Sequence, residues 1–412
     1  MQKVNKILNN LKAEDKEIYL LYILPISLLA GSLIVNINIL LLIIAFFLKT
    51  KKSLLVKAFS NKLIISLVIF NFYLIFNSIL ISDNSESIIR AVGFFRFILL
   101  AIAISFFINF KNSMYIKKII YFWIIIIVIT CLDVCIEKIF GSNILGFTSD
   151  YRGRIGSFTR DELNIGGFLF GFLSFFLFYI FTKKKFSLLG ILFFFIIAFI
   201  TGERANMLKI LIILSFCFIF ILELDIKKKI SIILISFLCL FIFVNFDIDN
   251  ELKKRYIGKI ESIDFNSLEN TIKNNKNLLH YSTAYEIFKQ NKLFGIGIKN
   301  FRHKSGEKKY QIFEDRNGNS THPHQIHFEL LSELGLIGYL TMISILIYSI
   351  FKGIKLYLIN KKNNLIELTT ALFVLTSILP LLPSGSFFTT TTATFFWINF
   401  SFLIRRQFSF FS

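Results

Sequence analysis

Residues 163–182 read LNIGGFLFGFLSFFLFYIFT, and after Lys183, Lys184 and Lys185 a second apolar run, FSLLGILFFFIIAFIT, occupies 186–201. A helix needs about 20 apolar residues to cross the roughly 30 Å hydrocarbon core of a bilayer. Lysines that follow such a run are typical of a loop kept in the cytoplasm. This stretch therefore predicts two transmembrane helices joined by a short cytoplasmic loop.

The same alternation of apolar runs and basic clusters fills most of the chain. Of its 412 residues, 55% are hydrophobic and 17% are charged, which is more apolar than the roughly 45–50% of soluble domains. The net charge of +20 is divided among short clusters between the runs, which argues against a nucleic-acid-binding face. The sequence therefore predicts an all-α polytopic membrane helix bundle and excludes a soluble enzyme. About twelve spans are expected, at 18–33, 35–48, 63–82, 92–110, 119–138, 163–182, 186–201, 206–224, 230–246, 334–351, 364–381 and 388–404.

Lysine clusters predict how this bundle is oriented. With twelve spans, every cluster falls on one side of the membrane, and both termini lie on that side. An excess of lysine marks that side as cytoplasmic. The clusters lie near 3–16, 49–57, 111–118, 183–185, 227–229 and 352–362.

We expect three parts along the chain. Transmembrane helices one to nine with short periplasmic loops occupy 1–246, a large periplasmic loop with an amphipathic helix occupies 247–333, and the last three helices with a cytoplasmic tail occupy 334–412. A polar loop of this length is a candidate functional domain rather than a passive turn. All four cysteines lie inside apolar runs, so they are expected to be packing residues.

Arginines gather on the side opposite the lysine clusters. A guanidinium offers a planar fork of donors that suits phosphate, whereas an ammonium is a point charge. Arg96 lies inside a span, where a charge is costly, so it should face a polar cavity or a partner, or form a structural salt bridge. The asymmetry predicts an anionic, phosphate-bearing ligand on the outer face. Nine of the eleven arginines lie on or near that face: Arg90, Arg96, Arg152, Arg154, Arg160, Arg204, Arg255, Arg302 and Arg316.

Two outer connections concentrate these charges. Residues 151–162 hold Arg152 and Arg154 just ahead of a glycine-rich helix, and their alternative interpretation is a solvated charged loop. Glu203 and Arg204 lie between two apolar helices, where the alternative is an ion pair that ends the helix. Both connections are candidate anion-binding segments.

Histidines mark the end of the long loop, in the segment 320–339. We expect a helix that begins near Pro323, with Thr321 or His322 as its cap. His324 would then lie in the first turn, where the positive helix end favours a neutral imidazole, and His327 would share its face. The His-x-His-x-x-His spacing with Glu329 is also compatible with zinc. A polar helix lying at the membrane surface is the plainest alternative.

Three motifs together resemble the O-antigen ligase and O-antigen polymerase superfamily of polytopic bacterial glycosyltransferases. His324-Gln325, nine residues and Gly335-Leu-Ile-Gly338 match its His-[Asn/Ser/Gln]-x9-Gly-x-x-[Gly/Thr/Tyr] signature. Residues 201–204 are similar to its outer arginine motif, and 292–302 resemble its PLxGxGxxNF element. The resemblance is firm from about 195 to 345.

Two positions depart from the family pattern. The family's second arginine has no counterpart in residues 278–282, and Lys292 stands where proline is common. The arginines that could serve instead are Arg302, Arg255 or the pair Arg152 and Arg154.

The resemblance implies a GT-C-like bundle in the bacterial inner membrane that acts at its periplasmic face. It implies transfer of a glycan from undecaprenyl diphosphate to an acceptor hydroxyl with inversion, without a metal, a cofactor or a nucleotide sugar; no nucleic-acid partner is expected. His324 would be the base, and Arg204 would neutralise the diphosphate. Further substrate contacts are expected from Arg152, Arg154, Glu203, His280, Arg302, His322, Gln325 and His327.

The acceptor and the class of activity have alternatives. A ligase of lipopolysaccharide biosynthesis would use lipid A-core as acceptor, whereas a polymerase would extend the lipid-linked repeat. Charges within spans, such as Arg96 and Asp133, would also suit a transporter or flippase of lipid-linked glycans. Asp133 is otherwise expected to join Glu137 and Lys138 in a structural ion-pair set.

Overall fold

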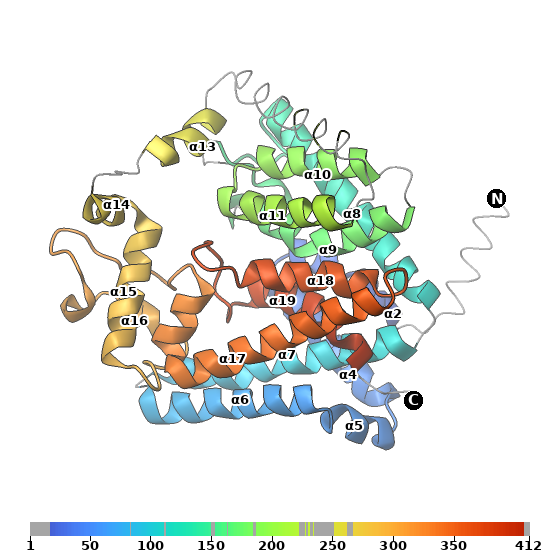
Figure 1. Cartoon of the computed structure of the whole chain (residues 1–412), viewed down its shortest axis with the longest axis horizontal. Coiled ribbons are helices and arrows are strands. Elements are labelled where there is room, and N and C mark those ends of the chain that lie inside the picture. Colours follow the sequence, from blue (N-terminus) through green and yellow to red (C-terminus); the bar gives the residue numbers. More distant parts are fainter. Residues whose placement is uncertain are drawn as a thin grey trace.

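The computed structural model describes residues 17–82, 84–110, 113–149, 153–162, 164–183, 187–221, 227, 230, 234, 251–261 and 267–407. Within these residues every regular element is a helix (Figure 1). The helices of the N-terminal part are α2 (Ile18–Tyr22), α3 (Leu24–Leu29), α4 (Ser32–Lys49), α5 (Lys52–Phe59), α6 (Lys62–Ile81), α7 (Ser85–Phe110), α8 (Ser113–Phe140), η1 (Ser157–Glu162), α9 (Ile165–Lys183), α10 (Ser187–Ile200) and α11 (Arg204–Phe220). The remaining helices are α13 (Glu251–Glu261), α14 (Leu268–Asn274), α15 (Lys276–Gln290), α16 (Phe301–Lys304), η2 (Lys308–Tyr310), α17 (Ile326–Ile359), α18 (Leu365–Ser377), α19 (Thr390–Ile404) and η3 (Arg405–Gln407).

Six of the described helices are long and apolar enough to cross a membrane. They differ in how much of their surface the protein covers. In α7 and α9, 72% of the apolar window is buried, whereas in α4 and α6 the share is 39%. Helices α7 and α9 therefore lie inside the bundle, and α4 and α6 leave apolar side chains at its surface. The six spans are Ser32–Lys49, Lys62–Ile81, Ser85–Asn109, Tyr115–Phe140, Ile165–Lys183 and Ile326–Ile359.

Two expected spans differ from the observed helices. Residues 18–33 do not form one helix, because the chain breaks after Tyr22 and again at Gly31, whose φ of 109° is open to glycine. The expected span 334–351 is the continuation of α17, which already starts at Ile326. The expected span 230–246 lies outside the described helices, so twelve spans remain a prediction.

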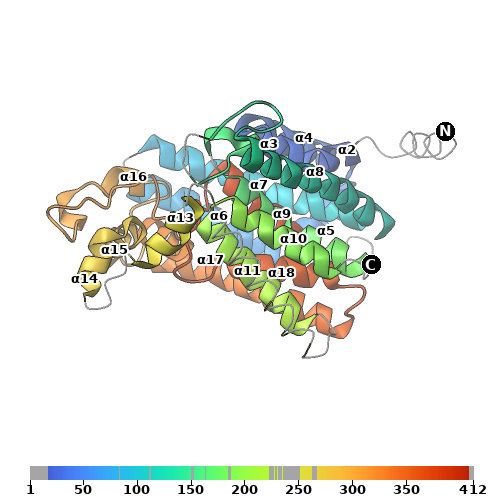
Figure 2. The ribbon, with the colours of Figure 1, turned by 90° about the horizontal axis from the view of Figure 1, so that it is seen from above.

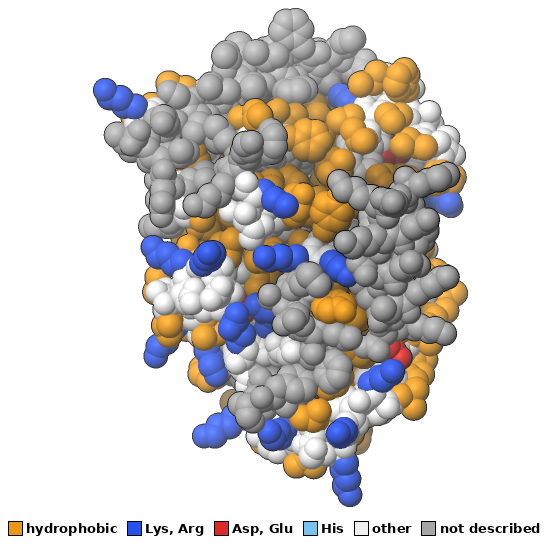
Figure 3. Space-filling view, turned by 90° about the vertical axis from the view of Figure 1, so that its right-hand side faces the viewer, with side chains coloured by type: hydrophobic (Ala, Val, Ile, Leu, Met, Phe, Trp, Pro, Cys, Tyr) orange, Lys and Arg blue, Asp and Glu red, His pale blue; other side chains and the backbone are white. Residues whose placement is uncertain are grey.

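Two ends of the bundle differ in what they carry. Helices α13, α14, α15 and α16 gather at one end, and α5 lies at the other (Figures 1 and 2). Figure 3 looks onto the α5 end, where Lys and Arg side chains outnumber Asp and Glu. The α5 end thus carries a surplus of basic side chains, and which compartment each end faces remains a prediction.

Close packing of α9 against α19 fixes the middle of the bundle. Asn399 Nδ2 donates to Gly171 O at 2.7 Å. A Cβ at Gly171 would lie 2.3 Å from the Phe395 ring, so only glycine admits this approach. Cys131 and Cys217 are buried and unpaired, which agrees with the packing role predicted for them.

Candidate active site

Arginines and histidines from distant parts of the chain line one cavity of about 840 Å³. It lies between the loop helices and the neighbouring ends of α9, α11, α17, α18 and α19. Arg204 and His324 both belong to its wall. The expectation that these two motifs meet at one site is therefore met in the geometry. The charged and histidine residues of the wall are Arg154, Glu162, Glu203, Arg204, Lys209, Arg255, Lys299, Arg302, His322 and His324.

Three arginines form one side of this cavity. Arg204 is the first residue of α11, and its Nη1 donates to Arg255 O at 2.9 Å. Arg255 Nε in turn donates to Gly202 O at 2.9 Å. Burial, and then the charges of Arg154 and Arg204, lower the pKa of Arg255. Three guanidinium groups held this close favour an anion between them.

Glu203 holds the arginine side in place. It is the N-cap residue of α11, and its Oε1 accepts from Gly166 N at 2.7 Å while Oε2 accepts from Asn206 Nδ2 at 2.7 Å. Arg154 Nη2 lies 3.8 Å from Glu203 Oε1. Burial raises the pKa of this carboxyl. The ion partner recorded for Glu203 is therefore Arg154, on the outer connection, rather than its neighbour Arg204.

The histidine side begins with the start of α17. Gln325, and not Thr321 or His322, is the N-cap residue, because its side-chain oxygen accepts from His327 N at 2.7 Å and Phe328 N at 3.0 Å. The predicted cap is therefore wrong. His324 precedes the helix with a φ of 58°, which is uncommon for a residue with a side chain.

A loop from another part of the chain holds His324 in this backbone conformation. Ser384 N donates to His324 O at 2.8 Å. The His324 Nε2 lies 3.1 Å from Ser320 Oγ. Residues on both sides of the histidine thus fix its backbone and its ring.

Burial and two neighbouring histidines determine the charge of His324. Its ring centroid lies 4.0 Å from that of His322 and 5.4 Å from that of His280. Burial, followed by these neighbouring histidines, lowers the pKa of His324 to about 4. Burial likewise lowers the pKa of His322 to about 4. The imidazole is neutral at neutral pH as predicted, but the cause is burial among histidines rather than the helix end.

Gln325 and His327 lie outside the lining of this cavity. His327 Nε2 lies 2.6 Å from Ile378 O, and its Nδ1 lies 3.1 Å from Tyr339 Oη. These contacts join α17 to the end of α18. His324 and His327 do not share a helical face, because His324 lies before the helix.

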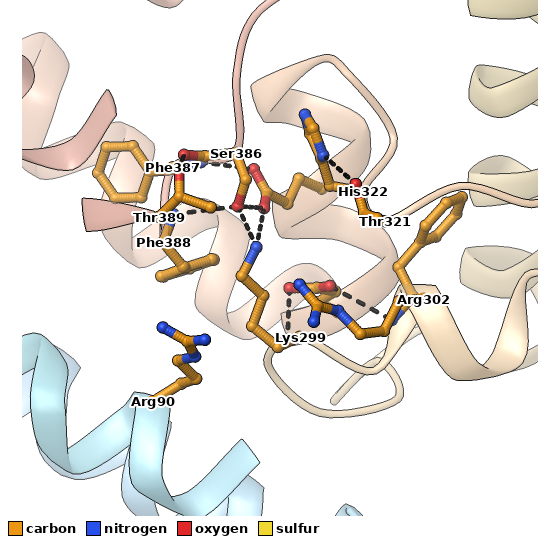
Figure 4. A network of polar contacts seen from close by, with 12 residues as sticks. Arg90, Lys299, Arg302, Thr321, His322, Ser386, Phe387, Phe388 and Thr389 are labelled. Atoms are coloured by element: carbon orange, nitrogen blue, oxygen red, sulfur yellow. Dashed lines mark hydrogen bonds and ion pairs between the residues drawn. The ribbon is translucent and has the colours of Figure 1, made fainter. Parts of the chain in front are cut away.

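A buried network that sequence reasoning did not single out supports the cavity wall (Figure 4). Lys299 Nζ donates to Ser386 Oγ at 2.5 Å and lies 4.0 Å from Glu329 Oε1. Glu329 accepts from Ser386 Oγ and from Phe387 N, the latter at 2.8 Å. The side chains of Lys299 and Glu329 are each 1% exposed. The network ties the 295–301 loop and the 384–388 loop to the first turns of α17.

Glu329 was the carboxylate considered as a zinc ligand, and it is engaged in this network instead. Across the described ranges, no three His, Cys, Asp or Glu residues are grouped as a metal site would require. The one signal for the network in the sequence was Lys299 itself, a charge directly after the apolar stretch Gly-Ile-Gly-Ile at 295–298.

The segment 292–302 and the motif from His324 to Gly338 pack together as one structural unit. Helix α17 is interrupted at Gly335, whose φ is 64°. The interruption lets Ile296 N donate to Ser332 O at 3.0 Å and Leu336 N donate to Lys292 O at 2.8 Å. A Cβ at Gly335 would lie 2.3 Å from Leu293 O. The glycine that follows Gln325 after nine intervening residues is therefore required by the crossing of the 292–297 segment over the helix.

The other predicted site residues are spread around this unit. Arg302 lines the cavity, and its Nη1 lies 3.4 Å from Glu86 Oε1. His280 lies behind His324, with its Nδ1 3.0 Å from Gly318 O. Arg152 lies outside the described residues. Arg96 donates from Nη2 to Thr390 Oγ1 at 3.2 Å, so it faces a partner as expected.

Asp133 and Glu137 were expected to form an ion-pair set with Lys138, but the contacts that the structure shows for them are different. Asp133 Oδ1 accepts from Ile144 N at 2.8 Å, and Oδ2 accepts from Ser157 Oγ at 2.5 Å. Glu137 accepts from Gly156 N at 3.1 Å and from Ser157 N at 2.5 Å. Both carboxylates thus fold the outer connection onto the end of α8, which is a structural role.

Comparison with known proteins agrees with these motifs. A family model described as O-antigen ligase matches residues 189–343. No curated protein matches the chain. The matched segment contains Arg204, Lys299, His324 and Gly335, whereas Arg154 and the 384–388 loop lie beyond it. The resemblance of this membrane protein to the O-antigen ligase and polymerase superfamily, predicted from its motifs, is therefore confirmed over residues 189–343.

Proposed function

We propose that the protein transfers a glycan from a polyprenyl-diphosphate lipid, undecaprenyl diphosphate in bacteria, to an acceptor hydroxyl. The observation that carries this proposal is that Arg154, Arg204 and Arg255 share a cavity with His324. Cations suit the donor's diphosphate, and a neutral imidazole suits the acceptor's hydroxyl. Both reacting groups can thus meet in the same cavity.

Charge develops on the diphosphate as the reaction proceeds. The acceptor oxygen forms a bond to the anomeric carbon while the bond from that carbon to the diphosphate oxygen breaks, and the electron pair leaves with the diphosphate. A single displacement of this kind inverts the configuration at that carbon. Fixed guanidinium groups stabilise the growing negative charge without having to reorganise. Such a reaction needs no metal.

His324 takes the hydroxyl proton in this scheme. With a pKa of about 4, the ring is almost entirely in the accepting form at neutral pH. A ring with this pKa holds a proton weakly. Because the departing diphosphate adds negative charge nearby, it raises the affinity of the ring for the proton as the transfer occurs.

A second cavity adjoins the first and could bind the lipid tail of the donor. Its volume is about 680 Å³, and its wall includes apolar residues of α3, α8 and α9, such as Ile26, Ile129 and Phe168. It shares Glu162, Asn164, Thr391 and Phe395 with the first cavity. We place the first isoprene units here, because they are covalently attached to a headgroup in the adjoining cationic cavity.

Orientation follows from the distribution of charge. Basic side chains outnumber acidic ones at the α5 end, and the cavity lies toward the loop helices. The positive-inside rule supports a multi-pass protein of the bacterial inner membrane with cytoplasmic termini and a periplasmic site.

Within the superfamily we propose the ligase activity, with lipid A-core as acceptor, and keep polymerase activity as the alternative. Gene deletion tests this choice. Loss of a ligase leaves lipid-linked polymer and unmodified lipid A-core on a gel. Single repeats on the core would instead assign a polymerase.

Purified protein in proteoliposomes tests the reaction itself. A glycosidic product from undecaprenyl-diphosphate glycan and lipid A-core is expected. Movement of the donor across the bilayer without any such product would assign a flippase and overturn the proposal.

A further inference from the structure

We propose that Lys209 binds an anionic group of the substrate from the membrane side of the cavity. Lys209 belongs to α11, is only 4% exposed and lines the cavity. The inference rests on the proposed function, because it needs an anionic substrate in that cavity.

Lys209 is the exception among the buried cations that the structure describes. Lys299 has Ser386 and Glu329 as partners, and Arg405 Nη2 lies 2.9 Å from Glu367 Oε1. For the ammonium of Lys209, the described residues provide neither an ion pair nor a hydrogen bond; its contact is with the face of Phe170, 5.4 Å from Nζ to the ring centroid. A buried charge without a counter-charge destabilises the protein. An ionisable residue retained inside a membrane helix under that cost points to function.

The position of Lys209 along α11 fits an anion held by the arginines. Glu203, Asn206 and Lys209 follow one another at a spacing of three and all line the cavity. Lys209 lies five residues beyond Arg204, which corresponds to about 7.5 Å along the helix axis. Side chains on a helix lean toward its N-terminus, so the ammonium extends back toward the arginine side. A diphosphate bound by the arginines from the loop side would meet Lys209 from the membrane side.

Anionic oxygens in this cavity can come from two sources, the diphosphate or a carboxylate on the transferred sugars. Both would neutralise Lys209 in the same way. The adjacent arginines favour the diphosphate, and the experiment separates the two sources.

Binding of farnesyl diphosphate to the full-length protein in nanodiscs provides the test. Lys209→Met removes the charge and keeps an unbranched apolar side chain, Lys209→Arg keeps the charge, and Lys52→Met is the matched control at an exposed lysine of α5. We expect Lys209→Met to weaken binding at least about tenfold, Lys209→Arg to stay within about threefold of wild type, and Lys52→Met to be unchanged.

Thermal stability of the ligand-free protein separates a binding role from a packing role. Because Lys209→Met removes an uncompensated buried charge, we expect its melting temperature to rise by about 2 °C or more while binding weakens. A lower melting temperature with unchanged binding and transfer would make Lys209 a packing residue and overturn the inference.

Transfer assays with two donors identify the anion. If Lys209→Met binds farnesyl diphosphate normally but loses transfer only from donors whose glycan carries a uronic acid, the anion is a sugar carboxylate and the inference stands. Normal binding and normal transfer from both donors would overturn it. Arg204→Ala is assayed in parallel: unchanged diphosphate binding there would count against the proposed arginine site and leave the result for Lys209 standing by itself.

Discussion

The arginine side and the histidine side of the cavity are built in different ways. Arg204 is exposed and is held by a hydrogen bond to Arg255 O, with further cations close by. His324 has a strained backbone that Ser384 fixes, next to a fully buried network around Lys299 and Glu329. From this difference we infer that the arginine side depends mainly on the charge of its side chains, whereas the histidine side depends mainly on the position of the His324 ring. Changes of charge and changes of geometry should therefore act differently on the two sides.

The largest effect is expected for His324→Ala. Transfer should fall by about 10³-fold, within the range known for removal of a general base, because the variant lacks the imidazole to which the proposed mechanism assigns the hydroxyl proton. Donor binding should change little, because the arginines remain. Rates of glycan transfer and binding of farnesyl diphosphate by the purified protein measure the two effects. His303→Ala is the matched control, since His303 is exposed and does not line the cavity. Full transfer by His324→Ala would remove the base assignment.

Next in size is Arg204→Ala. Loss of one cation at the diphosphate should lower kcat/KM by about 10²-fold, and donor binding should weaken with it. Arg204→Lys should recover part of the loss, because it restores charge without the fork of donors. Arg316→Ala, at an exposed loop position, is the control and should behave as wild type. If Arg204→Ala were as active as this control, the positive charge of Arg204 would not contribute to glycan transfer.

Geometry on the histidine side is tested by Gly335→Ala. A Cβ there meets Leu293 O at 2.3 Å in a left-handed backbone, so we expect a loss of about 1–3 kcal/mol in the free energy of unfolding. Gly258→Ala in α13 is the matched control, because nothing lies within 4 Å of its added Cβ. Thermal melting of both variants in detergent checks the difference. Equal melting temperatures would show that the crossing of 292–297 over α17 is not required.

The smallest effect concerns pH. Because burial lowers the pKa of His324 to about 4, the base is neutral throughout pH 6–8, and kcat/KM should vary less than about twofold there. An imidazole with a pKa near 6.5 would lose about fourfold by pH 6. Stability should follow the same groups: between pH 6.5 and 4 the unfolded chain binds protons at His322 and His324 that the folded chain does not, so the free energy of unfolding falls as pH falls. A fall in activity centred near pH 6.5 would contradict the burial of His324.

Sequence reasoning found both sides of the site but not what supports them. Arg204 and His324 were identified from motifs, and both line the cavity. The start of α17 was placed wrongly, because the side-chain amide of Gln325 caps the helix in place of the two expected candidates, Thr321 and His322. Lys299 and Lys209 were not singled out, since lysine elsewhere in this chain marks loops.

The sequence by itself determined that the chain is a helical membrane protein and that its motifs resemble those of the O-antigen ligase and polymerase superfamily. These features depend on hydropathy, charge and local spacing, all of which can be read along the chain. Only the tertiary structure decided that Arg255 joins Arg204, that Gly335 is an interruption crossed by 292–297, and that Lys209 lies in the cavity wall without a partner in the described part of the protein. Each of these depends on contacts between segments far apart in sequence, and neither hydropathy nor spacing specifies which such segments meet.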